Sequence, residues 1–348
     1  MRCNESSIAS SAAAAASRSD SPRALYVHLP FCTIRCPYCD FATLPYRVQG
    51  ETSYLAALER ELELLELERA PLDSLFLGGG TPNALGSDAL ARLVGLLEKH
   101  FRFAPQAERS IEANPSLVSR AQAQHLRQLG FTRISLGAQS FAASTLRFLG
   151  RDHTAADIER AVDLLRAAGL VNVSLDLIFG VPGQTQADWR ADLEHAIRLR
   201  PTHLSAYELT IESGTPLHQQ WLWGRVRRTG DDETARHYAL ARRVLADRGY
   251  AQYEVSNFAL AGYRCRHNER YWRNESYVGV GVSAASYVAG VRRTNHRSIR
   301  LYERDLASGL LPVAQVEQLA PRAAARETVV VGLRLIEGVP ERRPHRSI

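Results

Sequence analysis

The chain has 348 residues, 45% of them hydrophobic, which is enough for one large globular domain or two ordinary ones. No apolar run approaches the roughly 20 residues of a membrane helix, and the first residues lack the Leu-rich segment of a secretory signal, so we expect a cytoplasmic protein. The net charge of +6 comes almost entirely from arginines, which are spread among acidic residues along the predicted helices. This pattern does not favour a nucleic-acid partner.

In chain order, residues 1–22 are rich in Ser and Ala and have little to bury, so we expect a disordered tail there. Short apolar runs then alternate with amphipathic stretches, which have recognisable ends. Thr52 can cap a helix that buries Leu55 and Leu58, Ser119 can start another, and Gly169 can stop a helix over residues 156–168. A further helix is predicted over residues 187–199. The predicted strands cover residues 25–28, 74–77, 110–112, 133–137, 172–179 and 203–209.

Strand followed by helix, six times, predicts an α/β fold with a parallel sheet and right-handed crossovers. Six units are too few for a closed eight-stranded barrel, so we expect a partial (β/α)6 barrel or a doubly wound sheet over residues 23–217. Residues 218–339 predict a smaller α+β region beside that sheet. Its helices are expected at 233–248, 298–306 and 323–335, and its strands at 253–258 and 277–287. Residues 340–348 are basic and should form a frayed tail.

Three of the five cysteines, Cys32, Cys36 and Cys39, stand within eight positions, directly after the first predicted strand. Three thiolates can hold three corners of a 4Fe-4S cube and leave one iron open to a small molecule. An odd and sparse cysteine count argues against a disulfide framework. Structural zinc sites usually repeat a Cys-x-x-Cys pair, and none follows here, but a zinc-bound interaction module stays an alternative.

Polar residues follow the other predicted strands where each strand ends. The run Gly78-Gly79-Gly80-Thr81 allows close backbone approach, although a plain tight turn would look the same. Function collects at the carboxyl ends of parallel strands, so these residues predict a polar pocket above an apolar floor. The other candidates are Glu112, Gln139, Arg151 and Asp176, the last of which faces the pocket only if strand alternation points it inward.

A second notable run is Cys265-Arg266-His267-Asn268-Glu269-Arg270-Tyr271-Trp272. A histidine beside two aromatic residues can serve a flat, metal-containing ligand by axial ligation and stacking. Packing of the aromatic pair, with a hydrogen-bonded surface histidine, is the structural alternative.

With these motifs assembled, the chain resembles the radical S-adenosylmethionine superfamily, whose mark is Cys-x-x-x-Cys-x-x-Cys. The resemblance extends over residues 25–338, and it is closest to the branch that contains oxygen-independent coproporphyrinogen oxidase. Its supporting runs are residues 28–31, 78–82, 112–115, 134–141, 149–153, 176–182 and 208–216.

The resemblance implies a 4Fe-4S cluster on Cys32, Cys36 and Cys39, with S-adenosylmethionine on the open iron. In the superfamily, an electron from the reduced cluster splits a sulfonium C–S bond, and the cofactor carries that chemistry. An electron donor such as flavodoxin or ferredoxin is therefore implied as a partner. The positions that match the S-adenosylmethionine site of the family are Tyr26, Gly79, Gly80, Thr81, Glu112, Gln139, Arg151 and Asp176.

Within the branch, the chain looks like the HemW-like haem chaperones, which carry His-Asn-x-x-Tyr-Trp. The matching residues here are His267, Asn268, Tyr271 and Trp272, which implies haem as cargo and apo-haemoproteins, such as membrane-bound respiratory enzymes, as clients. The decarboxylating oxidases carry a further cysteine two positions after the third ligand, where this chain has Phe41. Coproporphyrinogen III oxidation, a step of porphyrin biosynthesis, is therefore the alternative function. After Val339 the sequence departs from the family, and we expect a short C-terminal helical part to be missing or replaced.

Overall fold

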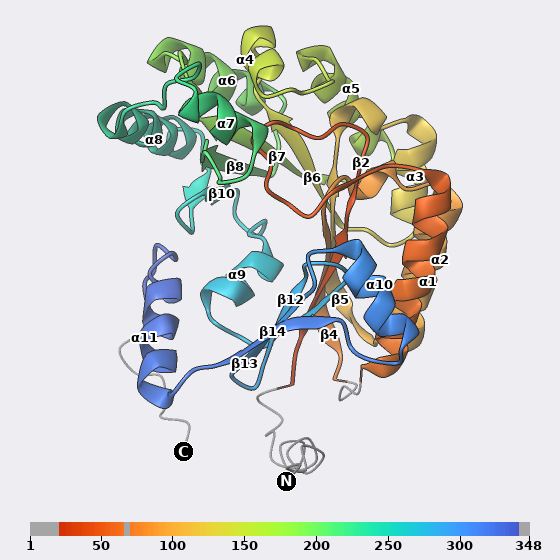
Figure 1. Cartoon of the computed structure of the whole chain (residues 1–348). Coiled ribbons are helices and arrows are strands. Elements are labelled where there is room, and N and C mark those ends of the chain that lie inside the picture. The colour runs from red at the N-terminus through yellow and green to blue at the C-terminus, as the bar shows by residue number, and fades with distance from the viewer. Residues whose placement is uncertain (1–20, 66–69, 341–348) are drawn as a thin grey trace.

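The computed structural model describes residues 21–65 and 70–340 (Figure 1). The predicted disordered tail at 1–22 therefore lies outside the described residues except for its last two positions, and the predicted frayed tail at 340–348 does so except for its first. Among the described residues, no helix has the length and hydropathy to span a membrane.

Six parallel strands form the centre of a nine-stranded sheet, and they stand side by side in chain order. A doubly wound sheet would reverse its strand order at one point. Sequential order with right-handed crossovers instead places the connecting helices on one face, which is the arrangement of an open, partial barrel. Figure 1 shows these helices around the outside of the sheet. The strands are β1 (Ala24–Leu29), β4 (Leu72–Gly79), β5 (Phe103–Ala113), β6 (Arg133–Gln139), β7 (Asn172–Phe179) and β8 (His203–Glu208).

The helices predicted over 156–168 and 187–199 are found at Ala155–Ala167 and Gln186–Arg198, whereas the predicted start at Thr52 is wrong. Ser119 caps α3 by accepting a hydrogen bond from Gln122 N, as predicted. Thr52 is not a cap, because α1 already begins at Val48; Glu51 fixes that start by accepting hydrogen bonds from Tyr46 and from Gly86 N. The helices are α1 (Val48–Leu64), α2 (Ser87–His100), α3 (Arg120–Gln128), α4 (Ala143–Phe148), α5 (Ala155–Ala167), α6 (Gln186–Arg198), α7 (Pro216–Leu222) and α8 (Asp231–Ala246).

The region after α8 adds strands to both edges of the main sheet. The antiparallel strands β10 (Asn257–Ala259) and β9 (Ala251–Gln252) extend it beyond β8, and β11 (Val278–Val280) pairs in parallel with β1 at the opposite edge. In the chain, α9 (Arg266–Trp272) lies between β10 and β11, and it contacts β4. A separate three-stranded sheet is formed by β12 (Ala285–Val288), β13 (Val291–Asn295) and β14 (Val313–Gln318), accompanied by α10 (Ile299–Ala307) and α11 (Pro321–Gly332).

Strand alternation separates an apolar outer face from a polar inner face. On β6 and β7, alternate residues face the outer helices: Ile134, Leu136, Leu175 and Leu177 are fully buried in the hydrophobic core. Their neighbours, among them Asp176, line the interior of the barrel. The core therefore lies between the sheet and the outer helices, and the interior is left for a site.

Candidate functional site

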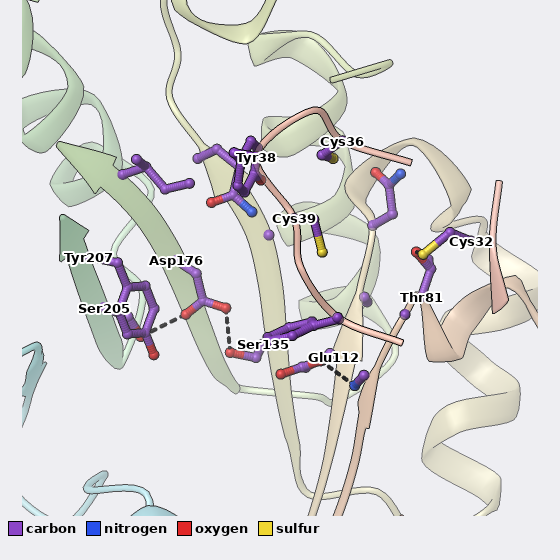
Figure 2. A pocket seen from close by; sticks show the side chains of 18 of the residues that line it. Cys32, Cys36, Tyr38, Cys39, Thr81, Glu112, Ser135, Asp176, Ser205 and Tyr207 are labelled. Carbon is purple, nitrogen blue, oxygen red and sulfur yellow. Dashed lines mark hydrogen bonds between the residues drawn. The ribbon is translucent and has the colours of Figure 1, made fainter. Parts of the chain in front are cut away.

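A cavity of about 560 Å³ occupies the barrel interior and opens at the carboxyl ends of the strands. Its volume falls within the usual range for small-molecule sites. The upper part, here called the rim, is formed by the loops after the strands, and Figure 2 shows the three cysteines and Thr81 around it. The lower part, here called the floor, is formed by Arg133 and His203 at the amino ends of β6 and β8, and by α9 with the residue before it.

The loop that follows β1 carries Cys32, Cys36 and Cys39 and is here called the cysteine loop. It brings the three side chains to the rim, where all of them line the cavity. Thr81 Oγ1 donates to Cys32 Sγ at 3.6 Å, and Arg151 Nη1 donates to Cys36 Sγ at 3.4 Å. Burial raises the pKa of the Cys32 and Cys39 thiols. All the cysteines that the structure describes are free.

Three free thiols around one cavity fit a cluster whose iron atoms each take one thiolate. Metal binding would deprotonate these thiols and so overcome their raised pKa. The described residues contain no group of three such ligands close enough to surround a single metal ion. A cube does not require that closeness, because its thiolates bind different irons.

The cysteine loop is held by backbone contacts on both sides. Its first strand, β2 (Phe31–Cys32), pairs with β3 (Leu44–Pro45), and Leu217 N donates to Pro37 O at 2.8 Å. Gly80 also packs against the loop, where a Cβ would stand 2.6 Å from Phe31 O. These backbone contacts hold the loop that carries the three thiols against the rest of the fold.

Next to the cysteine loop, the run Gly78-Gly79-Gly80-Thr81, here called the glycine loop, contacts the buried carboxyl group of Glu112. Gly79 has a φ of +109°, a conformation that favours glycine, and its amide donates to Glu112 Oε2 at 3.1 Å. Burial, and secondly the charge of Asp176, raise the pKa of Glu112 to about 8, although the Gly79 amide opposes the shift. Glu112 is therefore largely protonated at neutral pH until a cation or a donor stabilises its charge.

Asp176 points into the cavity from β7, which answers the question left open by the sequence. Its carboxylate accepts hydrogen bonds from Ser205 Oγ at 2.7 Å, Ser135 Oγ at 2.8 Å and Ser174 Oγ at 3.2 Å (Figure 2). Burial raises its pKa, and the hydroxyl donors from Ser205 and Ser135 act in the opposite direction. Sequence reasoning missed the three serines, although inward alternation on β6, β7 and β8 would have found them.

The remaining predicted rim residues also line the cavity. Gln139 has a φ of +62° after an irregularity in the pairing of β6 with β7, which turns its side chain at the strand end. Arg151 donates to Gly137 O at 3.1 Å as well as to Cys36. Tyr26 contacts His28 Nδ1 through its hydroxyl at 3.1 Å, and burial raises the pKa of Tyr26.

At the floor, three of the four residues predicted for haem line the cavity: His267, Asn268 and Tyr271. His267 is only 1% exposed; its Nδ1 bonds with Ser74 Oγ at 3.0 Å and its Nε2 with Tyr271 Oη at 2.8 Å. Burial, with the nearby charge of Arg270, lowers the pKa of His267 to about 3, so the imidazole is neutral at physiological pH. The fourth residue, Trp272, lies away from the cavity under the Arg334 guanidinium, 4.2 Å from its ring centroid.

The prediction of an apolar floor is wrong. Arg133, His203 and Cys265 line the lower cavity and are each no more than 2% exposed. His203 bonds with Ser174 Oγ at 2.7 Å and with Tyr253 Oη at 2.8 Å, and burial lowers its pKa well below the usual range. The short apolar runs of the sequence belong to the outer faces of the strands, and the polar residues that interrupt them face the floor.

Comparisons with known proteins agree on one family. The sequence pattern described as the Radical SAM superfamily matches residues 26–196. A haem chaperone, HemW, of Synechocystis sp. is 36% identical over 329 residues, which cover 91% of this chain and 79% of that protein. HemW of Mycobacterium tuberculosis is 38% identical over 324 residues, covering 92% and 83%. Among solved structures, the radical SAM enzyme coproporphyrinogen III oxidase (HemN) of Escherichia coli matches with a TM-score of 0.81 and 25% identity, over 91% of this chain and 76% of that one.

Proposed function

Because the chain belongs to the radical SAM superfamily and, within it, to the family of HemW haem chaperones, we propose that it carries haem to apoproteins. A 4Fe-4S cluster and S-adenosylmethionine would occupy the rim of the same cavity. The observation that carries the proposal is the arrangement of that cavity, which has three free thiols at its rim and a neutral histidine at its floor. Respiratory enzymes are the client class that we propose.

At the rim, Cys32, Cys36 and Cys39 would hold the cluster. When bound, the cluster supplies an open iron for the amino and carboxylate groups of S-adenosylmethionine, and an electron that a flavodoxin or ferredoxin would deliver. Arg151, which already donates to Cys36 Sγ, would offset the negative charge of the thiolates.

The rest of the rim would hold S-adenosylmethionine. The amides of Gly79 and Gly80 allow close approach of the ligand, since neither residue has a Cβ. The sulfonium cation and the ligand's hydroxyl and amino groups would stabilise the ionised form of Glu112, and Asp176 with its three serines would present a fixed acceptor. Gln139, Tyr26 and Thr81 would complete the lining of this part of the cavity.

At the floor, His267 would ligate the haem iron. A neutral imidazole is the form that binds iron, and its lowered pKa keeps that form available without a proton to remove. Nε2 is the nitrogen that would reach the metal, because Nδ1 bonds with the buried Ser74 Oγ whereas Nε2 bonds with the Tyr271 hydroxyl. That hydroxyl would swing aside on haem binding, and Asn268 would lie beside the ligand.

A second candidate is oxidation of coproporphyrinogen III, which the match to HemN favours. Phe41 argues against it: this residue is 54% exposed and lines the mouth of the cavity, where the decarboxylating oxidases have a cysteine. A phenyl ring offers neither a ligand nor a redox-active sulfur there.

The test is anaerobic reconstitution of the full chain followed by a haem titration. We expect about four irons and four sulfides per chain, and a Soret band that saturates with haem. His267→Ala should weaken haem binding and leave the brown cluster absorbance intact. The matched control is His195→Ala, since His195 lies on the outer helix α6 and bonds with Glu159.

Three results would contradict the proposal. Haem affinity unchanged in His267→Ala would remove this residue from the site. Absence of saturable haem binding in the reconstituted protein would reject the chaperone function. Accumulation of protoporphyrinogen IX from coproporphyrinogen III, S-adenosylmethionine and a reductant would replace it with the oxidase.

A further inference from the structure

Arg133 places a buried cation at the cavity floor without an ion-pair partner among the described residues. Its side chain is 2% exposed and lines the cavity. Among residues 21–65 and 70–340, only Nη1 of the guanidinium has partners: it donates to Asn172 Oδ1 at 3.4 Å and to Tyr263 O at 3.3 Å, both long contacts. Nε has no hydrogen-bond partner in the described part of the chain. Guanidinium groups stay charged in proteins. Burial of such a charge carries a large desolvation penalty unless an anion pairs with it.

The two carboxylates whose charges act on Arg133, Glu108 and Asp176, already accept hydrogen bonds from other groups. Glu108 accepts hydrogen bonds from Arg266 N and His267 N, both at 3.4 Å, and from Cys265 Sγ at 3.7 Å. Asp176 accepts from its three serines. Neither carboxylate forms an ion pair with Arg133, so the free donors of the guanidinium are left for a ligand.

We propose that Arg133 is a carboxylate-binding subsite at the cavity floor, and that the carboxylate is a propionate of the haem that His267 ligates. This assignment rests on the proposed function and adds to it the group that orients the ligand. A planar fork of donors matches the two oxygens of a carboxylate, and the propionates are the anionic groups of haem.

The chemistry of haem matches the two floor residues. Its iron lies at the centre of the ring and its propionates lie at the edge, so one molecule can use an imidazole and a guanidinium at once. S-adenosylmethionine also has a carboxylate, which the family directs to the cluster iron at the rim. Arg133 begins β6 and Gln139 ends it, so the two positions are six residues, or about 20 Å, apart along the strand.

The experiment compares haem with haem dimethyl ester, in which both propionates are blocked, on the full chain. Wild-type protein should bind haem roughly ten- to a hundred-fold more tightly than the ester, as expected for a hydrogen-bonded charge pair. Arg133→Gln should bind both with the same weaker affinity, and its Soret maximum should stay that of wild type because His267 is intact. Arg133→Lys should recover part of the discrimination. Arg198→Gln, on the outer helix α6, is the matched control.

The outcomes separate this inference from the proposed function. If neither porphyrin binds wild-type protein, the haem-carrier function fails and the subsite fails with it. Equal affinities of wild type for the two porphyrins would overturn the subsite alone, even if Arg133→Gln cannot be purified. Discrimination that persists in Arg133→Gln also overturns it. Weaker S-adenosylmethionine binding in Arg133→Gln, with unchanged haem discrimination, would assign the guanidinium to the other carboxylate and reject the propionate.

Discussion

The rim and the floor of the cavity are built on opposite principles. At the rim, Cys32 Sγ and Cys36 Sγ accept long hydrogen bonds from Thr81 and Arg151, and Gly79 and Gly80 line the cavity. At the floor, His203 and His267 each bond through both ring nitrogens with neighbouring side chains. The rim is therefore completed by its ligands, whereas the floor is satisfied by the fold except at Arg133.

The largest expected effect distinguishes the two regions by their cysteines. Cys36→Ser should lose nearly all cluster iron after anaerobic reconstitution, because a serine hydroxyl is a poor substitute for a thiolate on a soft iron–sulfur cluster. Cys265→Ser is the matched control: Cys265 is buried at the floor, and its thiol contacts Glu108. It should keep the full iron and sulfide content. Iron lost equally from both variants would break the separation of rim from floor.

The pH dependence of stability should have opposite signs for the two regions. The pKa of Glu112 is raised from 4.5 to about 8, so the folded state binds more protons between these values, and the free energy of unfolding falls as pH rises through that window. The pKa of His267 is lowered from 6.5 to about 3, so its contribution falls as pH drops from 6.5 to 3. Urea unfolding of the cluster-free protein at several pH values measures both.

Glu112→Gln should remove the fall in the free energy of unfolding at alkaline pH, here called the alkaline limb. The variant should be more stable than wild type at about pH 9 by a few kcal/mol. His267→Asn should flatten only the acid limb. An alkaline limb that survives in Glu112→Gln would assign it to another buried carboxyl group.

A smaller effect tests how tightly the rim is built. Gly79→Ala should cost about 1–3 kcal/mol, because φ is +109° and the added Cβ would stand 2.7 Å from the His28 ring. Gly95→Ala is the control: Gly95 lies within α2, has open space around it and should gain about 0.5–1 kcal/mol. Denaturant unfolding measures both changes. Equal costs at the two positions would mean that the rim is not strained by a side chain.

The sequence allowed the rim to be predicted more completely than the floor. The cysteine spacing and the polar residue after each strand are local patterns, and parallel strands bring their carboxyl ends together. The six strand–helix units likewise indicated the partial barrel, and Asn172–Phe179 was predicted with its observed bounds. The predicted helix start at Thr52 was wrong because Glu51 fixes an earlier start through hydrogen bonds with Tyr46 and Gly86.

The floor could not be predicted because its contacts join distant parts of the chain. Ser74 meets His267 across 193 positions, and Glu108 meets Cys265 across 157. No spacing rule links such pairs; the strands that extend the open sheet at its two edges, β11 beside β1 and β10 beside β8, flank α9 in the chain and bring it beneath the barrel. Inward alternation on β6 and β8 could still have marked Arg133 and His203 as interior residues.

The smallest effect concerns a series of hydrogen bonds that runs from the floor of the cavity up to Asp176. Cys265 N donates to Tyr253 Oη, which donates to His203 Nε2; His203 Nδ1 then donates to Ser174 Oγ, and Ser174 Oγ donates to Asp176. Each hydroxyl donates once in this order, so one assignment satisfies every group. Ser174→Ala should cost about 1 kcal/mol, as should Tyr253→Phe.

If these hydrogen bonds act as a unit, the second substitution removes a bond from a series that the first has already interrupted. The double variant should then lose less free energy of unfolding than the sum of the two single variants, by at least about 0.5 kcal/mol. The measurement is a double-mutant cycle by urea unfolding, with Ser205→Ala in place of Ser174→Ala as the control, since Ser205 bonds with Asp176 and has no bond with His203. Additive costs in both cycles would mean that this series of hydrogen bonds does not couple Tyr253 energetically to Ser174.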